Sequence, residues 1–187
     1  MKWRFVHRVL LYFAGAACLT CLLLASTGCG PKEPQLSEAA QNFKKEVLEG
    51  FAILAPPMVQ PAANRNVEAM NKVLAAGFEK AEKSGRPLPF RAVILDPQGF
   101  MLAYYPLDVK PAIRFSDYQG VKEVIKKRRI SSGVLYFADG SQAYIVLAPL
   151  LFNENLVGMI CLAIKADMAQ DKWHLTRKDF QDINFNP

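Results

Sequence analysis

The fold is decided by residues 88–105, LPFRAVILDPQGFMLAYY, in which an apolar strand runs into a tight turn and then returns. Residues 92–95 form the apolar strand, and Asp96 ends it. Pro97 fixes the backbone φ angle of the turn, and Gly99 supplies the conformational freedom that a chain reversal needs. The stretch therefore predicts a β-hairpin near the middle of the chain.

Two amphipathic helices are expected before this hairpin, because apolar residues recur there every three or four positions. The first begins after Ser37, a good N-cap residue, and Pro56 and Pro57 are expected to stop or kink it. The second begins near Asn66 and ends at residues 84–87, which include glycine and proline.

A third helix is expected after the hairpin, with Ser116 as its N-cap. The basic run 126–129 suits its C-terminal end, although anionic lipid headgroups are an alternative partner for that run. Three strands follow, at residues 133–138, 142–151 and 156–164, and Asp139-Gly140 makes a tight turn between the first two. This order of elements predicts an α+β fold, an antiparallel sheet with helices packed against it.

The N-terminal residues 1–28 predict an export signal. Three basic residues lie within the first eight positions, an apolar run covers residues 9–25, and small residues precede Cys29. The segment resembles a bacterial lipoprotein signal, which is cut before a cysteine that receives lipid such as palmitate, so Cys29 is the expected lipidation site. An uncleaved helical anchor is the alternative, because the apolar run is only slightly below transmembrane length.

Both alternatives place the rest of the chain outside the cytoplasm, facing the periplasm and attached to a membrane. Residues 29–37 are expected to be a short proline-containing tether. Gly30 stands where some lipoproteins carry the Asp that retains them at the inner membrane, which favours the outer membrane. At the other end, residues 167–187 are expected to fold back as a C-terminal latch segment, with a short helix from Thr176 capped by Asp179.

Composition and motifs restrict the possible functions. The formal charge of +6 falls to +3 without the three basic residues of the signal, and no concentrated basic face is present, so no nucleic-acid partner is expected. Cys161, within an apolar strand, is expected to be a small buried hydrophobe. The chain lacks metal-spaced ligands, a phosphate-binding glycine loop and a nucleophile beside a base, so neither a metal, a cofactor nor enzymatic activity is expected.

Four stretches resemble the Cache family of extracellular PAS-like sensor domains. They are residues 94–99, 115–118, 144–150 and 156–160. The resemblance implies long helices before a five-stranded antiparallel sheet, and a small metabolite, often a carboxylate or amino acid, bound between the sheet and the segment after the second strand. It assigns residues 38–166 to a Cache-like sensor domain, here without an output module of its own. The Arg-x-x-Trp-type segment of amino-acid-binding members is absent, which speaks against an amino-acid ligand.

Five residues are candidates for ligand binding. Arg114 can hold a ligand carboxylate with two parallel hydrogen bonds, although a solvated surface arginine is the alternative. Tyr118, Tyr136, Tyr144 and Tyr105 each offer an apolar wall and one hydroxyl, although tyrosines of the core or the sheet surface are equally consistent with the pattern. We expect Arg114 and Tyr118 to close over Tyr136 and Tyr144.

Two functions remain open from the sequence. The first is a membrane-tethered, extracytoplasmic sensor-type domain that binds a small metabolite, such as a carboxylate, and presents the bound state to an envelope or receptor protein. The second is a structural or assembly lipoprotein of the cell envelope, in which a ligand-free PAS-like fold serves as a protein-interaction surface. In both, Asp96 is expected to cap its turn rather than to contact a ligand.

Overall fold

The computed structural model describes residues 35–107 and 115–186. The predicted signal, the lipidation site Cys29 and the candidate Arg114 lie outside these residues. Among the helices that are described, none is both long enough and apolar enough to cross a membrane.

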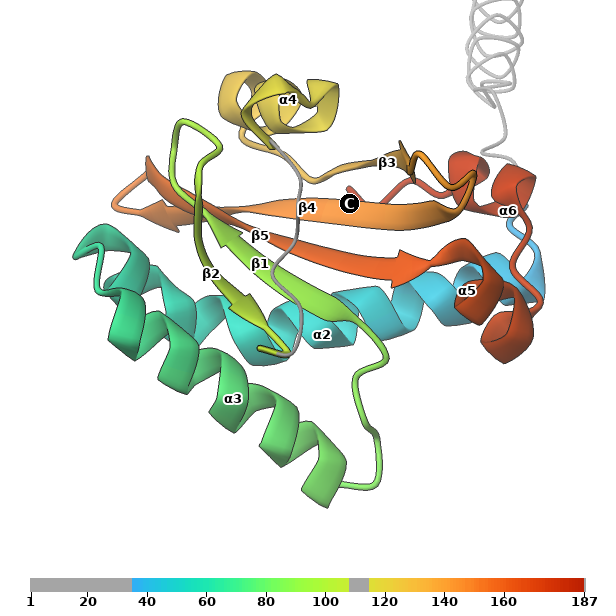
Figure 1. Cartoon of the computed structure of the whole chain (residues 1–187), viewed down its shortest axis with the longest axis horizontal. Helices are drawn as coiled ribbons and strands as arrows, with labels where there is room; N and C mark the ends of the chain where they lie inside the picture. Colours follow the sequence, from blue (N-terminus) through green and yellow to red (C-terminus); the bar gives the residue numbers. More distant parts are fainter. Residues whose placement is uncertain (1–34, 108–114, 187) are drawn as a thin grey trace, which may run out of the picture. The chain divides into compact units, whose positions relative to one another are not determined.

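Five antiparallel strands form one sheet in the order β2-β1-β5-β4-β3 (Figure 1). The strands are β1 (Arg91–Leu95), β2 (Met101–Tyr105), β3 (Ser131–Tyr136), β4 (Gln142–Phe152) and β5 (Asn155–Lys165). Two hairpins, β1–β2 and β3–β4, are joined through β5, which pairs with β1 on one side and with β4 on the other. The predicted α+β fold with a PAS-like sheet is confirmed.

The turn between β1 and β2 is held by Asp96. Its Oδ1 accepts hydrogen bonds from the backbone N–H groups of Gln98 and Phe100, both at 2.9 Å. Gly99 has a φ of +87°, and a Cβ there would lie 3.0 Å from the Cα of Ser116. Asp96 therefore has the structural role predicted for it, and Gly99 is required both by the turn and by close packing.

Helix α2 (Glu38–Ala63) continues beyond Pro56 and Pro57, which were expected to stop or kink it. Pro56 and Pro57 are exposed, whereas Leu54 and Met58 beside them are completely buried. An internal proline costs about 3 kcal/mol, and burying one large apolar side chain stabilises by about 1.5–3 kcal/mol. Pro61 is a third internal proline, so burial of several residues, Phe51, Leu54, Met58 and Ala62, is needed to favour the helix despite the lost backbone hydrogen bonds. The alternative in which the helix stops at Pro56 and Pro57 is wrong.

Helix α3 (Val67–Lys83) begins as predicted, since the side chain of Asn66 accepts a hydrogen bond from the N–H of Ala69. The prediction for α4 (Gln119–Lys127) is wrong at its start. A short 3₁₀ helix, η1 (Phe115–Asp117), occupies the expected first turn, and α4 follows it without a side-chain cap.

The C-terminal segment contains α5 (Ala166–Trp173) and α6 (Arg177–Asp182). Thr176 and Asp179 form a reciprocal capping box at the start of α6, as predicted. The Asp179 carboxylate also accepts a hydrogen bond from Ser37 Oγ at 2.7 Å. Ser37 is the N-cap of α2, so one carboxylate joins the first helix of the domain to the last.

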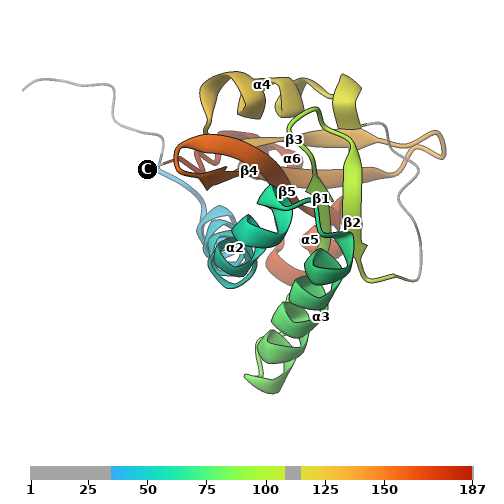
Figure 2. The ribbon, with the colours of Figure 1, turned by 90° about the vertical axis from the view of Figure 1, so that its left-hand side faces the viewer.

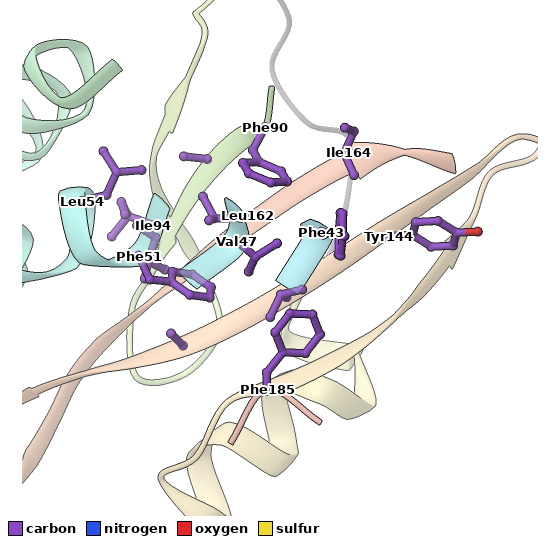
Figure 3. Close-up of a cluster of buried hydrophobic side chains, with 14 of the residues drawn as sticks. Phe43, Val47, Phe51, Leu54, Phe90, Ile94, Tyr144, Leu162, Ile164 and Phe185 are labelled. Carbon is purple, nitrogen blue, oxygen red and sulfur yellow. The ribbon is translucent and has the colours of Figure 1, made fainter. Parts of the chain in front are cut away.

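Helices cover both faces of the sheet (Figure 2). The larger core lies between the sheet and α2, with contributions from α3, α5 and the C-terminal segment (Figure 3). Phe43 lies among four aromatic rings at centroid distances of 5.0–6.4 Å, and each of these contacts is edge-to-face. Those rings belong to Phe90, Trp173, Phe180 and Phe185. The C-terminal segment therefore packs back onto α2.

Replacing Phe43 by alanine should lower the free energy of unfolding by about 3–5 kcal/mol, because it removes a ring that is 1% exposed from the centre of this cluster. Urea denaturation monitored by tryptophan fluorescence measures the loss. Phe100→Ala is the control. That ring is 62% exposed, so the change should stay within about 0.5 kcal/mol. Equal effects of the two changes would contradict the assignment of the core.

The hydrogen bonds from Thr176 and Ser37 hold the pKa of Asp179 below its usual value. A lowered folded-state pKa stabilises the protein above the unfolded pKa of about 4, and this stabilisation is lost as the pH falls through the folded value. Asp179→Asn should therefore reduce stability at pH 7, by less than about 1 kcal/mol because the group is exposed. Urea denaturation at pH 7 and pH 3 should show the difference from the wild type shrinking at pH 3. Asp171→Asn, at an exposed acid on α5, should show no such pattern.

Candidate functional site

A second, smaller core lies on the face of the sheet that α4 covers, and we call it the α4 layer. Its floor is formed by side chains of β1, β4 and β5 that are at most 2% exposed: Val93, Leu95, Ile145, Leu147, Met159 and Cys161. Phe115, Val121 and Val124 cover this floor from η1 and α4, and Tyr104 and Tyr118 pack at its margin. This is the face covered by η1 and α4, the described elements that come after β2, and the family resemblance implies a ligand between the sheet and the segment after its second strand.

Tyr118 fills the space between α4 and β3. A Cβ on Gly133 would lie 1.9 Å from the Tyr118 hydroxyl oxygen, and a Cβ on Gly120 would lie 2.5 Å from a ring carbon of the same tyrosine. Only glycine at both positions allows the ring to lie there. Burial raises the pKa of the Tyr118 hydroxyl to about 12, so this group stays protonated at neutral pH and can donate a hydrogen bond.

The other predicted tyrosines lie on the opposite face of the sheet. The ring of Tyr144 stacks on that of Phe180 with 4.4 Å between the ring centroids, and the ring of Tyr105 packs against Phe78 of α3 with 4.6 Å between the centroids. Both belong to the larger core or its margin. The expectation that Tyr118 closes over Tyr144 is therefore wrong, because the sheet separates these two side chains.

Tyr136 also lies on the face of Tyr144. Val134, which pairs with Tyr144, packs on the larger core, and Tyr136 is two residues further along β3. The Tyr136 ring is 60% exposed, and the guanidinium carbon of Arg177 lies 5.5 Å from its centroid. Of the predicted ligand-binding residues that the structure describes, only Tyr118 is in the α4 layer.

Cys161 in the floor of the α4 layer is completely buried, and this burial raises the pKa of its thiol to about 12. Since the thiolate is the reactive form of cysteine, the side chain is inert at neutral pH. The prediction that Cys161 acts as a small buried hydrophobe is confirmed.

A charged hollow of about 460 Å³ lies between the first half of α2, the loop after α3, and α5. Glu46 lines it and accepts hydrogen bonds from Lys172 Nζ at 2.7 Å and from Trp173 Nε1 at 2.9 Å. Arg86 and Glu49 also line it, and neither forms an ion pair within residues 35–107 and 115–186. The sequence did not indicate this site, because Glu46 and Lys172 are 126 positions apart and no local motif connects them.

The basic run 126–129 ends α4 and begins the connection to β3, and all four side chains are exposed. Lys127 Nζ lies 3.6 Å from Glu123 one turn earlier, and Arg128 closes the helix with a φ of +53°. The predicted place of this run at a helix end is confirmed. Its contact with lipid headgroups stays a prediction. Within the described part of the chain, no group of three or more His, Cys, Asp or Glu residues could hold a metal ion.

No protein-family model and no curated protein sequence matches this chain. Solved structures do share its fold. A domain of a sensory box/GGDEF family protein from Vibrio parahaemolyticus superposes with a TM-score of 0.53 and 11% sequence identity, over 75% of this chain and 60% of that one. The E. coli DcuS sensor domain gives a TM-score of 0.51 and 9% identity, over 72% of this chain and 97% of that one.

An extracellular ligand binding receptor from Desulfohalobium retbaense gives a TM-score of 0.51 and 12% identity, over 72% of this chain and 25% of the receptor. This chain therefore spans about three fifths of the Vibrio structure and a quarter of the receptor. At these identities the similarity shows the fold alone, which this chain shares with these sensor and receptor structures.

Gly133→Ala should lower the free energy of unfolding by about 1–3 kcal/mol, because the new methyl group would overlap the Tyr118 hydroxyl. The loss should be smaller in a Tyr118→Phe background, where the nearest remaining ring atom is 3.2 Å away. Chemical denaturation of the wild type, the two single variants and the double variant measures this coupling. Additive effects of the two substitutions would show that Tyr118 does not lie over Gly133.

Proposed function

We propose that this protein is an extracytoplasmic sensor-type domain that binds a small anionic metabolite, such as a carboxylate, in the α4 layer. The observation that carries the proposal is the fold, a 2-1-5-4-3 antiparallel sheet with helices on both faces, which superposes on the DcuS sensor domain and on an extracellular ligand binding receptor. The proposal concerns binding and signalling rather than catalysis.

The chemistry of the α4 layer supports a ligand of this kind. Small-molecule sites are mostly apolar and contain a few well-placed polar groups. Here the floor is apolar, and the protonated hydroxyl of Tyr118 is a donor at its margin. Arg114, in the segment that follows β2, is the predicted partner of the ligand carboxylate. A ligand would occupy the space that the Tyr118 ring fills in the described structure, so binding would be coupled to movement of this side chain.

The N-terminal sequence supports attachment to a membrane. A lipid on Cys29 would leave a short tether before α2 begins at Glu38. Lasting attachment needs more than one acyl chain, as lipoproteins carry. The domain would then sense the periplasm and pass the bound state to an envelope or receptor protein, with the outer membrane favoured by Gly30.

A second candidate function is favoured by one observation, the filling of the α4 layer by the protein's own side chains. A ligand-free PAS-like fold of this kind would serve as a structural or assembly lipoprotein. Cross-linking in cells followed by mass spectrometry would then recover one stoichiometric envelope partner, whether or not metabolites are added.

Thermal unfolding of the full chain in the presence of a panel of two- to six-carbon mono- and dicarboxylates tests the sensor proposal. A carboxylate at about 100 times its dissociation constant should stabilise the protein by about 2.7 kcal/mol, seen as a rise in Tm. Arg114→Ala and Tyr118→Phe should each reduce this rise. Tyr136→Phe should leave it unchanged, because Tyr136 lies on the other face of the sheet.

Arg86→Ala is the second control for this experiment. Loss of the rise in Arg86→Ala but not in Arg114→Ala would place the ligand in the charged hollow instead of the α4 layer. If no carboxylate raises Tm, metabolite binding of this class is ruled out, and the assembly function is then the better account.

A further inference from the structure

Strand β3 is an edge strand of the sheet, and among the strands that the structure describes it pairs with β4 alone. Phe137 N–H donates to Ser141 O at 2.9 Å, so this opposed pair is hydrogen-bonded. Opposed pairs in an antiparallel ladder alternate between bonded and non-bonded. The register between β3 and β4 is unbroken, so the type of pair alternates from Phe137 back along β3. Tyr136, Val134 and Ser132 are therefore in non-bonded pairs. Their backbone N–H and C=O groups therefore point away from β4, toward the free edge.

The side chain of Asn186 shows how this edge is used. Its Oδ1 accepts from Ile130 N–H, and its Nδ2 donates to Ile130 O, both at 2.9 Å. A carboxamide thus reproduces the pair of hydrogen bonds that a neighbouring strand would make. Ile130 has the same outward orientation as Ser132 and Val134, since it is an even number of positions away. The alternation counted from Phe137 and the hydrogen bonds of Asn186 therefore agree that the even-numbered residues of β3 direct their backbone groups to the free edge.

The remaining outward groups have no such partner. Within the described ranges, 35–107 and 115–186, no hydrogen bond reaches the outward N–H and C=O groups of Ser132, Val134 and Tyr136. Edge strands are commonly protected by lysine, proline or a bulge. The sequence SGVLY at residues 132–136 contains neither lysine nor proline, and its register with β4 is regular.

Two adjacent hollows follow this edge, with volumes of about 300 Å³ and 350 Å³. Both are lined by Ser132 and by Gln181 of α6, so they form one groove with β3 on one side and α6 on the other. We call it the β3 groove and define it by Ser132, Val134, Tyr136, Phe180, Gln181 and Asp182. In Figure 1, α6 lies close to β3 at one end of the sheet.

We propose that the β3 groove binds an extended peptide segment of a partner protein, which adds to the sheet as a sixth strand. The backbones of Ser132, Val134 and Tyr136 present three N–H donors and three C=O acceptors at the spacing of a strand. The backbone of another extended segment can form hydrogen bonds with all six groups. The segment spans about five residues, or roughly 13 Å. It has no proline at the pairing positions, and it places an apolar side chain against Val134 and Phe180.

A single strand fits this groove better than the edge of a second copy does. Residues of α6 line the groove along β3, so an approaching second copy would have to fit its own α6 and the rest of its sheet beside this helix. A peptide strand brings no second helix with it. The inference goes beyond metabolite binding, and it does not depend on whether the α4 layer holds a ligand.

Selection of a phage-displayed random heptapeptide library against the full chain in mild detergent tests the proposal. The selected peptides should bind the wild type and Val134→Ile equally, because isoleucine keeps the N–H group and a branched apolar side chain. Val134→Pro should weaken binding by about tenfold or more, because it removes an outward donor that β4 does not use. Backbone hydrogen exchange at Ser132 and Val134 should slow when peptide is bound.

Gln181→Trp provides a second test that leaves the strand intact, because its larger side chain narrows the groove from α6. It should weaken peptide binding to a similar degree while leaving Tm unchanged. The proposal is overturned if no peptide is enriched, or if the selected peptides bind Val134→Pro and Gln181→Trp as tightly as the wild type. A dimer that forms without peptide and dissociates in Val134→Pro would also overturn it, in favour of a second copy. All these measurements are made without carboxylates, so their failure leaves the sensor proposal untouched.

Discussion

The pairing of β5 with both β1 and β4 is the constraint on which the rest of the structure depends. It joins a hairpin near residue 95 to a hairpin near residue 140, and in doing so it creates a sheet with two faces to bury. Residues of β5 alternate between the two cores, with Leu162 in the larger and Cys161 in the smaller. The long helix α2 and the short helix α4 both pack on surfaces that exist only because β5 lies between the two hairpins.

Features with a cause inside a few residues were predictable from the sequence. The turn held by Asp96, the helix start at Asn66 and the capping box of Thr176 and Asp179 each need only neighbouring atoms. The errors arose where distant packing outweighs local preference. Pro56 remains inside a helix because buried residues on both sides hold it there.

The candidate site was harder to predict than the fold, because the residue type of a tyrosine does not indicate which face of the sheet its side chain will lie on. Alternation along paired strands places Tyr136 and Tyr144 together, but it does not say which helices cover that face. Tyr118 belongs to the other face only because α4 packs on the side of the sheet opposite to α2, which the sequence pattern does not indicate. The hydrogen bonds of Glu46 with Lys172 and Trp173 join residues more than 120 positions apart, and no periodicity or motif signals such a contact.

The hydrogen bond between Ser37 and Asp179 has a consequence for the resistance of the domain to proteolysis. The first and last residues of most domains fray, and peptidases begin their attack at such frayed segments. Here the residue that starts the first helix is bonded to the residue that caps the last, and the rings of Phe180 and Phe185 are buried beside Phe43. Local unfolding at the start of α2 or in the C-terminal segment would therefore remove contacts that stabilise the other. The two ends of the domain are thereby protected together, by one hydrogen bond and one aromatic cluster, against the fraying that starts proteolysis.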